Sequence, residues 1–237
     1  MNIFTSELIG TAFMILLGNG VVANVALSKT KGNNSGLIVV AFGWAIAVFV
    51  GVFISSKASG AHLNPAITAA FAYLHKIDLS TVPYYVAGQM SGAMVGALLV
   101  WLTYRQHFWH TDDAAAKLSA FCTSPAIRSP LQNMVTEMVG TFVLVLAVLF
   151  IVAPAESLGA LDALPVSLIV LGIGLSLGGP TGYAINPARD LGPRIIHALL
   201  PMGKKGSSDW AYSWVPVIGP LLGALLAAVV FNVISGV

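Results

Sequence analysis

Long apolar runs alternate with shorter polar stretches along most of this chain. Six of the runs approach the roughly 20 mainly apolar residues that a helix needs to cross a lipid bilayer. They cover residues 4–27, 36–56, 82–104, 133–153, 163–179 and 211–235. The polar connections lie at 28–35, 105–132, 154–162 and 201–210. The pattern predicts an all-α membrane protein with six transmembrane helices, whose outer surface faces the lipid bilayer.

Two further apolar segments, 65–74 and 187–200, are too short to span a bilayer, and each begins at a proline. Proline is well tolerated in the first turn of a helix, because its missing N–H would have no partner there. Irregular backbone at membrane depth persists only where protein covers it or where it lines a wet cavity. The stretches SGAHL and TGYAI, which precede these segments, are therefore expected to line a lumen. The sequence predicts two re-entrant half-helices, which begin at the motifs Asn64-Pro65-Ala66 and Asn186-Pro187-Ala188.

Three pairs of matching segments indicate an internal repeat. ELIGTAF at 7–13 matches EMVGTFV at 137–143, SGAHLNPAIT at 59–68 matches TGYAINPARD at 181–190, and GAMVGALLV at 92–100 matches GPLLGALLA at 219–227. Each unit holds three spans, and because three is odd the second unit must enter the bilayer from the opposite face. The chain thus reads as one channel domain, 1–237, with an inverted 3+3 repeat: repeat 1 at about 1–104, a connecting loop at about 105–132 and repeat 2 at about 133–237.

Composition supports the membrane assignment. Charged residues are 8% of the chain and apolar residues 57%, whereas about a quarter of the residues in ordinary soluble domains are charged. The net charge of +2 gives no indication of a nucleic-acid partner. A single cysteine, Cys122, excludes an intrachain disulfide and a metal site built from cysteines.

Basic residues are distributed unevenly between the two predicted sides. Lys57 and Lys76 lie on the side of the termini, and the other nine of the 11 Lys and Arg residues lie on the opposite side. A plain count under the positive-inside rule would place that more basic side, and not the termini, in the cytoplasm.

The paired half-helices have a predictable chemistry. In an inverted repeat they enter from opposite faces and meet at their N-termini, each of which carries about half a positive charge. Such a junction opposes the passage of cations, including hydrated protons. The amides of Asn64 and Asn186 offer donors to a passing hydroxyl group, and the preceding backbone carbonyls offer acceptors, at Gly60, Ala61 and His62 and at Gly182, Tyr183 and Ala184. A polar file against an apolar wall suits small neutral hydroxylated solutes.

SGAHLNPAIT and TGYAINPARDLGP closely resemble the two signature loops of the major intrinsic protein family, the aquaporins and glycerol facilitators. The resemblance extends over essentially the whole chain. A lone Asn-Pro-Ala also fits an ordinary capped helix. The resemblance to the family therefore depends on the presence of two copies at equivalent positions of the repeat. The resemblance implies an aquaporin-like fold in the cell membrane, cytoplasmic termini, a homotetramer with one pore per subunit, and passive conduction without a cofactor or metal. The implied orientation disagrees with the count of basic residues.

The resemblance also implies a selectivity filter, formed by Trp44, Gly174, Tyr183 and Arg189. Water-selective members resemble Phe, His and a small residue at the first three of these positions. Here Gly174 is expected to leave room for a carbon backbone, with Trp44 and Tyr183 as an apolar corner and Arg189 as the donor of hydrogen bonds. Glycerol facilitators often have Phe in place of Tyr183, so its hydroxyl group leaves two outcomes open: a narrower pore, or an added polar contact.

Asp190 is typical of the solute-conducting branch of the family, in which Asp follows the filter arginine. Arg194 and Pro216 also match positions that resemble the glycerol branch. Because Arg194 follows Asp190 by four residues, the two side chains are expected to pair on one face of the half-helix.

Glu7 and Glu137 occupy equivalent places in the first span of each repeat. Carboxylates within a membrane are candidates for proton coupling, but their symmetry favours a supporting role, in which each accepts hydrogen bonds from the loop before a half-helix. His62 is interpreted as another support of its loop and not as a metal ligand. His107, His110, Asp112 and Asp113 lie in the connecting loop and are interpreted as solvated side chains, with an adventitious metal site as the alternative.

The sequence therefore predicts a passive channel for glycerol and similar small neutral solutes, with water. Dihydroxyacetone, urea or a protonated hydroxy acid are further candidate solutes. Two alternatives stay open: a water-selective aquaporin, which Gly174 and Asp190 argue against, and an ion-coupled secondary transporter, because such proteins also have inverted repeats and broken helices. An enzyme is not expected, because no nucleophile–base, paired-carboxylate or metal-ligand set lies within the spans.

Overall fold

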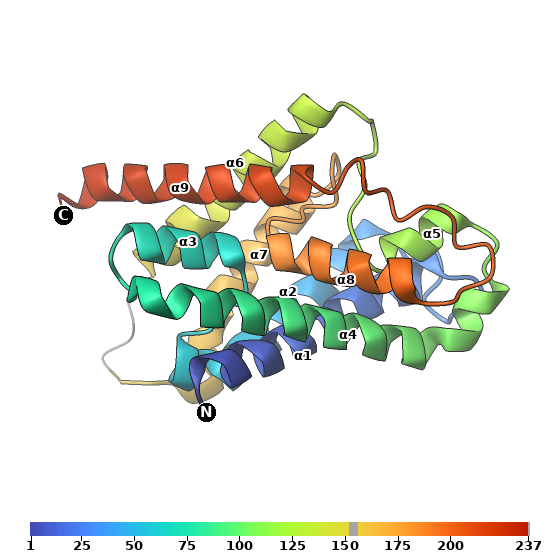
Figure 1. The fold of residues 1–237 in the computed structure, drawn as a ribbon, viewed down its shortest axis with the longest axis horizontal. Helices are drawn as coiled ribbons and strands as arrows, with labels where there is room; N and C mark the ends of the chain where they lie inside the picture. Colours follow the sequence, from blue (N-terminus) through green and yellow to red (C-terminus); the bar gives the residue numbers. More distant parts are fainter. Residues whose placement is uncertain (152–155, 237) are drawn as a thin grey trace.

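The computed structural model describes residues 1–151 and 156–236, and these fold into helices and loops (Figure 1). The helices are α1 (Ile3–Ala26), α2 (Leu37–Ser59), α3 (Pro65–Tyr73), α4 (Val82–His110), α5 (Ala114–Ser119), α6 (Pro130–Phe150), α7 (Leu164–Leu177), α8 (Pro187–Leu199) and α9 (Val215–Ser235). Short 3-10 helices at Leu79–Thr81 and Gly159–Ala163 precede α4 and α7.

Six helices in the described residues are long and apolar enough to cross a membrane: α1, α2, α4, α6, α7 and α9, where α4 and α7 are counted with the 3-10 turns before them. The half-helices α3 and α8 begin at Pro65 and Pro187, as predicted, and end one residue before the predicted boundaries. The predicted class, an all-α membrane protein with six spans and two re-entrant half-helices, is confirmed.

The boundaries of the connecting loop are corrected by the structure. Helix α4 continues to His110, although its apolar run ends near residue 104, and a short helix, α5, lies inside the predicted loop. Since a helix continues wherever its backbone bonds and caps allow, hydropathy alone places its end too early. Helix α6 begins earlier than predicted, at Pro130, and α9 begins later, at Val215. Residues 152–155, which belong to the predicted fourth span and the loop after it, lie outside the described residues.

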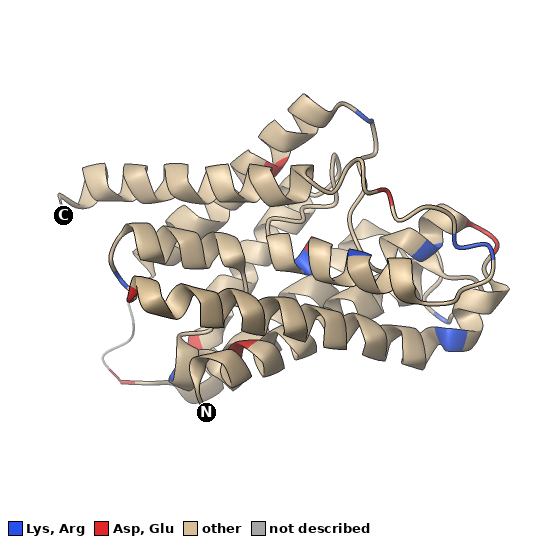
Figure 2. Ribbon diagram, in the orientation of Figure 1, with Lys and Arg blue, Asp and Glu red and all other residues tan. Residues whose placement is uncertain are grey.

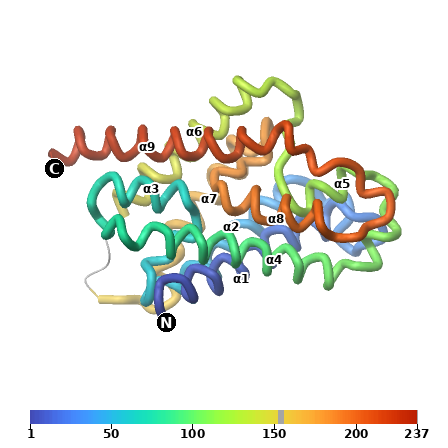
Figure 3. The backbone as a smooth tube through the Cα atoms, viewed as in Figure 1, coloured from blue at the N-terminus to red at the C-terminus, as the bar shows by residue number. Residues whose placement is uncertain are grey.

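Packing follows the inverted repeat. Helix α1 packs against α4 in the first repeat and α6 packs against α9 in the second, while α2 packs against α7 between the repeats. Each half-helix packs most extensively against the last span of the other repeat, α3 on α9 and α8 on α4. Figures 1 and 3 show α3 and α8 nearly in line, with both chain termini at the same end of the molecule. Opposed half-helices are therefore held by contacts that cross between the repeats.

Glycines of the third repeated segment allow these helices to approach closely. A Cβ atom on Gly92 of α4 would overlap the carbonyl oxygen of Leu8, and one on Gly223 of α9 would overlap that of Met138. Small residues at such positions are typical of tightly packed helices in membranes. These contacts make Gly223 the counterpart of Gly92, whereas the sequence match aligns Gly92 with Gly219, so the helix contacts of the two repeats correspond with a shift of four residues.

Candidate pore and selectivity filter

The two half-helices meet through a reciprocal pair of asparagines. Asn64 Oδ1 accepts a hydrogen bond from the N–H of Ala66 (2.9 Å), and Asn186 Oδ1 accepts from the N–H of Ala188 (3.0 Å), so each side chain caps its own helix. Asn64 Nδ2 donates to the carbonyl of Ile185, and Asn186 Nδ2 donates to that of Leu63, both at 2.8 Å. Each amide carries two N–H groups, so one N–H on each asparagine stays free of these bonds and can be offered to a solute.

Strained backbone precedes each asparagine. Ala61 and Leu63 have φ of 54° and 50°, and the equivalent residues Tyr183 and Ile185 have φ of 38° and 43°. Positive φ is uncommon for any residue with a side chain and is an outlier for β-branched Ile185. Such conformations cost about 1–3 kcal/mol each and persist only where the surroundings enforce them.

Two buried carboxylates supply that enforcement. Glu7 accepts hydrogen bonds from the N–H groups of His62 (3.0 Å) and Leu63 (2.7 Å). Glu137 accepts from the equivalent N–H groups of Ala184 (3.0 Å) and Ile185 (2.8 Å). The loop-supporting hydrogen bonds expected from the sequence are thus present in both repeats.

The loop of the first repeat has further supports. Gln89 of α4 donates to Glu7 Oε2 (2.8 Å) and to Thr68 Oγ1 (3.0 Å). His62 Nδ1 lies 3.1 Å from Thr68 Oγ1, and its ring stacks on that of Tyr85, with 4.3 Å between the ring centroids. His62 therefore belongs to a hydrogen-bonded layer behind the loop.

A cavity runs past these loops. The centres of water-sized molecules can occupy about 120 Å³ in it, which suits a file of small molecules better than a single water. Loop residues 60–64 and 183–186 and the side chain of Arg189 line it. Its other lining residues are Met14, Trp44, Val48, Val52, Ile67, Phe71, Leu144, Val148, Val166 and Val170. The cavity therefore combines polar groups from the loops with an apolar wall from the helices.

Three of the four predicted filter residues lie together at this cavity. Trp44, Tyr183 and Arg189 all line it, and the guanidinium carbon of Arg189 is 4.2 Å from the centroid of the Trp44 ring. The lining, as far as the chain is described, includes neither Gly174 nor Gly182. The structure therefore differs from the sequence-based expectation at these two glycines.

The space beside Gly174 holds the ring of Tyr183. A Cβ atom on Gly174 would lie 3.0 Å from Tyr183 Cζ and 3.1 Å from its hydroxyl oxygen, and one on Gly178 would lie 2.5 Å from Tyr183 Cδ1. The Tyr183 hydroxyl is buried, without a partner in the described part of the chain. The missing side chain at Gly174 thus leaves room for the Tyr183 ring at the wall of the cavity.

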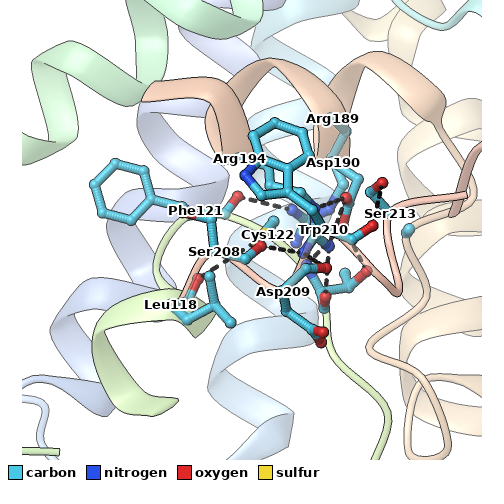
Figure 4. A network of polar contacts seen from close by, with 12 residues as sticks. Leu118, Phe121, Cys122, Arg189, Asp190, Arg194, Ser208, Asp209, Trp210 and Ser213 are labelled. Atoms are coloured by element: carbon cyan, nitrogen blue, oxygen red, sulfur yellow. Dashed lines mark hydrogen bonds and ion pairs between the residues drawn. The ribbon is translucent and has the colours of Figure 1, made fainter. Parts of the chain in front are cut away.

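An ion pair anchors the second half-helix (Figure 4). Arg194 and Asp190 are fully buried and lie 2.8 Å apart, as their spacing predicted. Asp190 also accepts hydrogen bonds from the N–H and the hydroxyl of Thr123, both at 2.7 Å. Arg194 donates to the carbonyls of Ser208 (2.7 Å) and Thr123 (3.0 Å). The pair thereby joins α8 to the loop before α6, through Thr123, and to the loop after α8, through Ser208.

Comparison with known proteins agrees with this geometry. Residues 1–231 match the family described as major intrinsic protein. The chain belongs to this family. It is 52% identical to the probable glycerol uptake facilitator protein of Thermotoga maritima, with 98% of this chain and 99% of the relative covered. It is 49% identical to the glycerol uptake facilitator protein of Streptococcus pneumoniae strain R6, with the same coverage. The X-ray structure of the aquaglyceroporin from Plasmodium falciparum matches with a TM-score of 0.85 and 31% identity, over 97% of this chain and 94% of that one.

In this member of the family, most Lys and Arg residues lie at the end of the molecule that holds α5 (Figure 2). Lys117 donates to the carbonyl of Gly203, and burial lowers the pKa of its ammonium group. Lys205 donates to the carbonyls of His197, Ala198 and Leu200 at the end of α8 (2.9, 2.7 and 2.8 Å). Two basic side chains of this end are thus held by main-chain oxygens.

The four loop residues that form the alternative metal site in the sequence each have another contact. His107 Nδ1 lies 3.1 Å from the carbonyl of Ser28, and His110 Nδ1 lies 2.8 Å from that of Gln106. Asp112 pairs with Lys204, whose hydrogen bond lowers the pKa of the carboxyl group. Asp113 caps α5.

Several residues of the site were missed by sequence reasoning. Gln89 and Thr123 bind the buried carboxylates, and the carbonyls of Leu63 and Ile185 bind the asparagine pair. Gln89 had a usable signal, because a polar side chain inside an apolar span needs a partner. Thr123, by contrast, lies in a polar connection, where hydroxyl groups are common.

Proposed function

We propose that this chain is a passive channel for glycerol and similar small neutral solutes, and that it also conducts water. The observation that carries the proposal is the two-sided lining of the cavity. Arg189 and the asparagine pair provide donors, loop carbonyls provide acceptors, and the helices provide an apolar wall. A polyol has hydroxyl groups along a carbon chain and matches both sides. The names of the two relatives, both glycerol uptake facilitators, support the same solute.

Exclusion of ions is the second part of the proposal. Two helix N-termini face the cavity, and Arg189 adds a charge close to them, so a cation meets a positive field where it has lost most of its water. This barrier comes from the field itself and needs no protein group that binds the ion. Protons are opposed by the same field.

An ion-coupled transporter is less well supported. Such a mechanism needs an ionisable group that the transported ion can reach. Among the described residues, the cavity lining includes neither Glu7 nor Glu137, and both carboxylates bind loop N–H groups. A water-selective pore is also less well supported, because Gly174 has no side chain that would push the Tyr183 ring further into the cavity. The same features give no reason to expect an enzyme.

We propose cell-membrane insertion with cytoplasmic termini and assembly as a homotetramer, each subunit with its own pore. The apolar side chains exposed on the spans, such as Phe42, Ile46 and Leu168, support contact with lipid or with other copies. Protease accessibility of tags at the termini, in sealed vesicles of known orientation, tests the topology. The mass of the complex in detergent tests the tetramer.

Swelling of liposomes tests the solute directly. Vesicles that contain the protein are exposed to excess glycerol at several pH values, with no ion gradient, and their shrinkage and reswelling are followed by light scattering. We expect fast shrinkage followed by reswelling as glycerol equilibrates. Rapid water loss without reswelling would overturn the glycerol proposal. Glycerol accumulation driven by a proton gradient would overturn passive conduction.

A further inference from the structure

Asn19 is a polar side chain in the apolar helix α1, and it is fully buried. A buried amide is costly unless its hydrogen-bonding groups have partners. Asn19 Nδ2 donates to the carbonyl oxygen of Phe121 at 2.9 Å, and Asn19 Oδ1 lies 3.5 Å from Arg189 Nη1. The orientation of the amide follows from chemistry, because a carbonyl only accepts and a guanidinium only donates.

The three groups form a closed triangle. Arg189 Nη1 lies 3.4 Å from the same Phe121 carbonyl that Asn19 binds. Both contacts of Nη1 are long for hydrogen bonds, whereas the bond between Asn19 and Phe121 has ordinary length. The amide therefore holds the Phe121 carbonyl firmly and presents two oxygen atoms, its own and that of Phe121, to one guanidinium nitrogen.

Asp190, the carboxylate next in sequence to Arg189, is engaged elsewhere. It binds Thr123 and Arg194. Within the described residues, Asn19 is the side chain whose oxygen reaches the Arg189 guanidinium, and the Trp44 ring lies against that guanidinium. The filter arginine is thus oriented by neutral groups only.

We propose that Asn19 is a positioning residue of the selectivity filter, which fixes Arg189 without cancelling its charge. The proposal rests on the function proposed above, because it assigns the source of solute selectivity in that pore. A carboxylate at position 19 would orient Arg189 equally well, but it would neutralise the field that opposes cations. A neutral amide separates the two tasks: it orients the guanidinium and leaves the positive charge in place.

The first test replaces Asn19 by Leu, which has similar size and no polar atoms. Without its fixed acceptors, Arg189 loses the position from which it donates to a hydroxyl, so we expect glycerol flux to fall about tenfold, the loss that one charged hydrogen bond accounts for. Water flux is expected to change much less. Fluxes of water, urea, glycerol and erythritol are measured in liposomes at equal protein content.

Thr11→Val is the matched control. Thr11 is buried in the same helix, and its hydroxyl has no partner in the described part of the chain. The substitution also removes one polar group from α1, but it does not touch Arg189. We expect the flux ratios of the control to equal those of the wild type. Equal changes in the Leu variant and the control would overturn the proposal.

Asn19→Asp separates position from charge and provides a second variant if the Leu variant does not fold. The new carboxylate keeps Arg189 oriented, so the ratio of glycerol to water flux is expected to stay near that of the wild type. Partial neutralisation of Arg189 is expected to raise the proton leak, followed with a pH-sensitive dye inside the vesicles. A leak unchanged from the wild type, or a glycerol loss as large as that of the Leu variant, would count against Asn19 as a neutral positioner.

Different results refute the role of Asn19 and the channel function. If the wild-type protein passes glycerol and the Asn19 variants keep all flux ratios and the proton barrier, Asn19 does not position Arg189. The channel proposal then stands. Wild-type protein that passes no glycerol removes the solute proposal. In that case the urea-to-water ratio and the proton leak of the variants still decide the role of Asn19.

Discussion

The half-helices α3 and α8 share their scaffold and differ in their charge. Both begin at a capping asparagine followed by proline, and both follow a strained loop held by a buried glutamate. The nine residues of α3 carry no charged side chain. Helix α8 carries Arg189, Asp190 and Arg194, where the equivalent positions of α3 are Ile67, Thr68 and Ala72.

This difference indicates which parts of the pore depend on symmetry and which do not. The midplane needs two opposed helix ends, so the asparagines and glutamates recur in both repeats. The proposed filter needs only one constriction, and the charged groups lie in one repeat. Thr68 binds His62 and Gln89, while Asp190 at the equivalent position binds Arg194. The symmetric part holds the chain in place, and the asymmetric part contains the proposed filter.

The largest effect is expected from removal of the buried ion pair that is present in α8 only. Arg194→Leu leaves Asp190 buried without its cation, and breaking such a pair typically costs about 3–5 kcal/mol. We expect a large loss of thermal stability in detergent. Arg128→Leu is the control, because the Arg128 side chain in its pair with Asp209 is half exposed, and exposed pairs contribute below about 1 kcal/mol. Similar losses of thermal stability in both variants would contradict the larger contribution expected from the buried pair.

The symmetric part can be tested with Glu7→Gln and Glu137→Gln. Each substitution leaves one amide N–H facing a loop N–H that the carboxylate had bound, and a hydrogen bond to a charged group contributes about 1.5–3 kcal/mol. We expect both variants to lose stability and glycerol flux to a similar degree. Chemical denaturation and liposome swelling measure the two quantities. Loss in one variant only would show that the repeats do not share this support.

Gly174→His tests the groove that accommodates Tyr183. The new side chain occupies the space of the Tyr183 ring and displaces the ring toward the cavity, so we expect glycerol flux to fall by roughly tenfold or more, the range for one misfitting group in an apolar site. Water flux should fall less. Gly172→Ala is the control on the same helix, because a Cβ atom there meets no atom within 4 Å. Equal loss of both fluxes would refute the filter assignment.

The smallest effect is expected from Tyr183→Phe. Its hydroxyl is buried without a partner in the described residues, so its removal should leave glycerol flux nearly unchanged and should not lower the melting temperature. Tyr85→Phe in the first repeat provides the contrast, because the Tyr85 hydroxyl donates to the carbonyl of Ser59 at 2.6 Å. Loss of that bond should cost about 1 kcal/mol. A larger loss in Tyr183→Phe would indicate that its hydroxyl binds the solute.

Local signals in the sequence predicted the half-helices to within one residue, since an asparagine cap and a proline in the first turn specify a helix start almost alone. The Asp190–Arg194 pair was predictable for the same reason, because both residues lie on one short helix. The end of α4 was not, since that helix continues past its apolar run. Two contacts could not be predicted from the sequence. The Tyr183 ring packs on Gly174 of another helix, and Asn19 contacts Arg189 across 170 residues of sequence.

The exchange of half-helices between the repeats bears on how the protein assembles. Helix α3 packs mainly on α9, the last span of the chain, and α8 packs mainly on α4. A truncated first repeat therefore leaves α3 without its principal neighbour, and neither half can form a complete pore wall alone. During synthesis, the first re-entrant segment must wait for the final span before it reaches its mature packing. A chain that stops between α8 and α9 is therefore expected to insert its earlier spans but to form no channel.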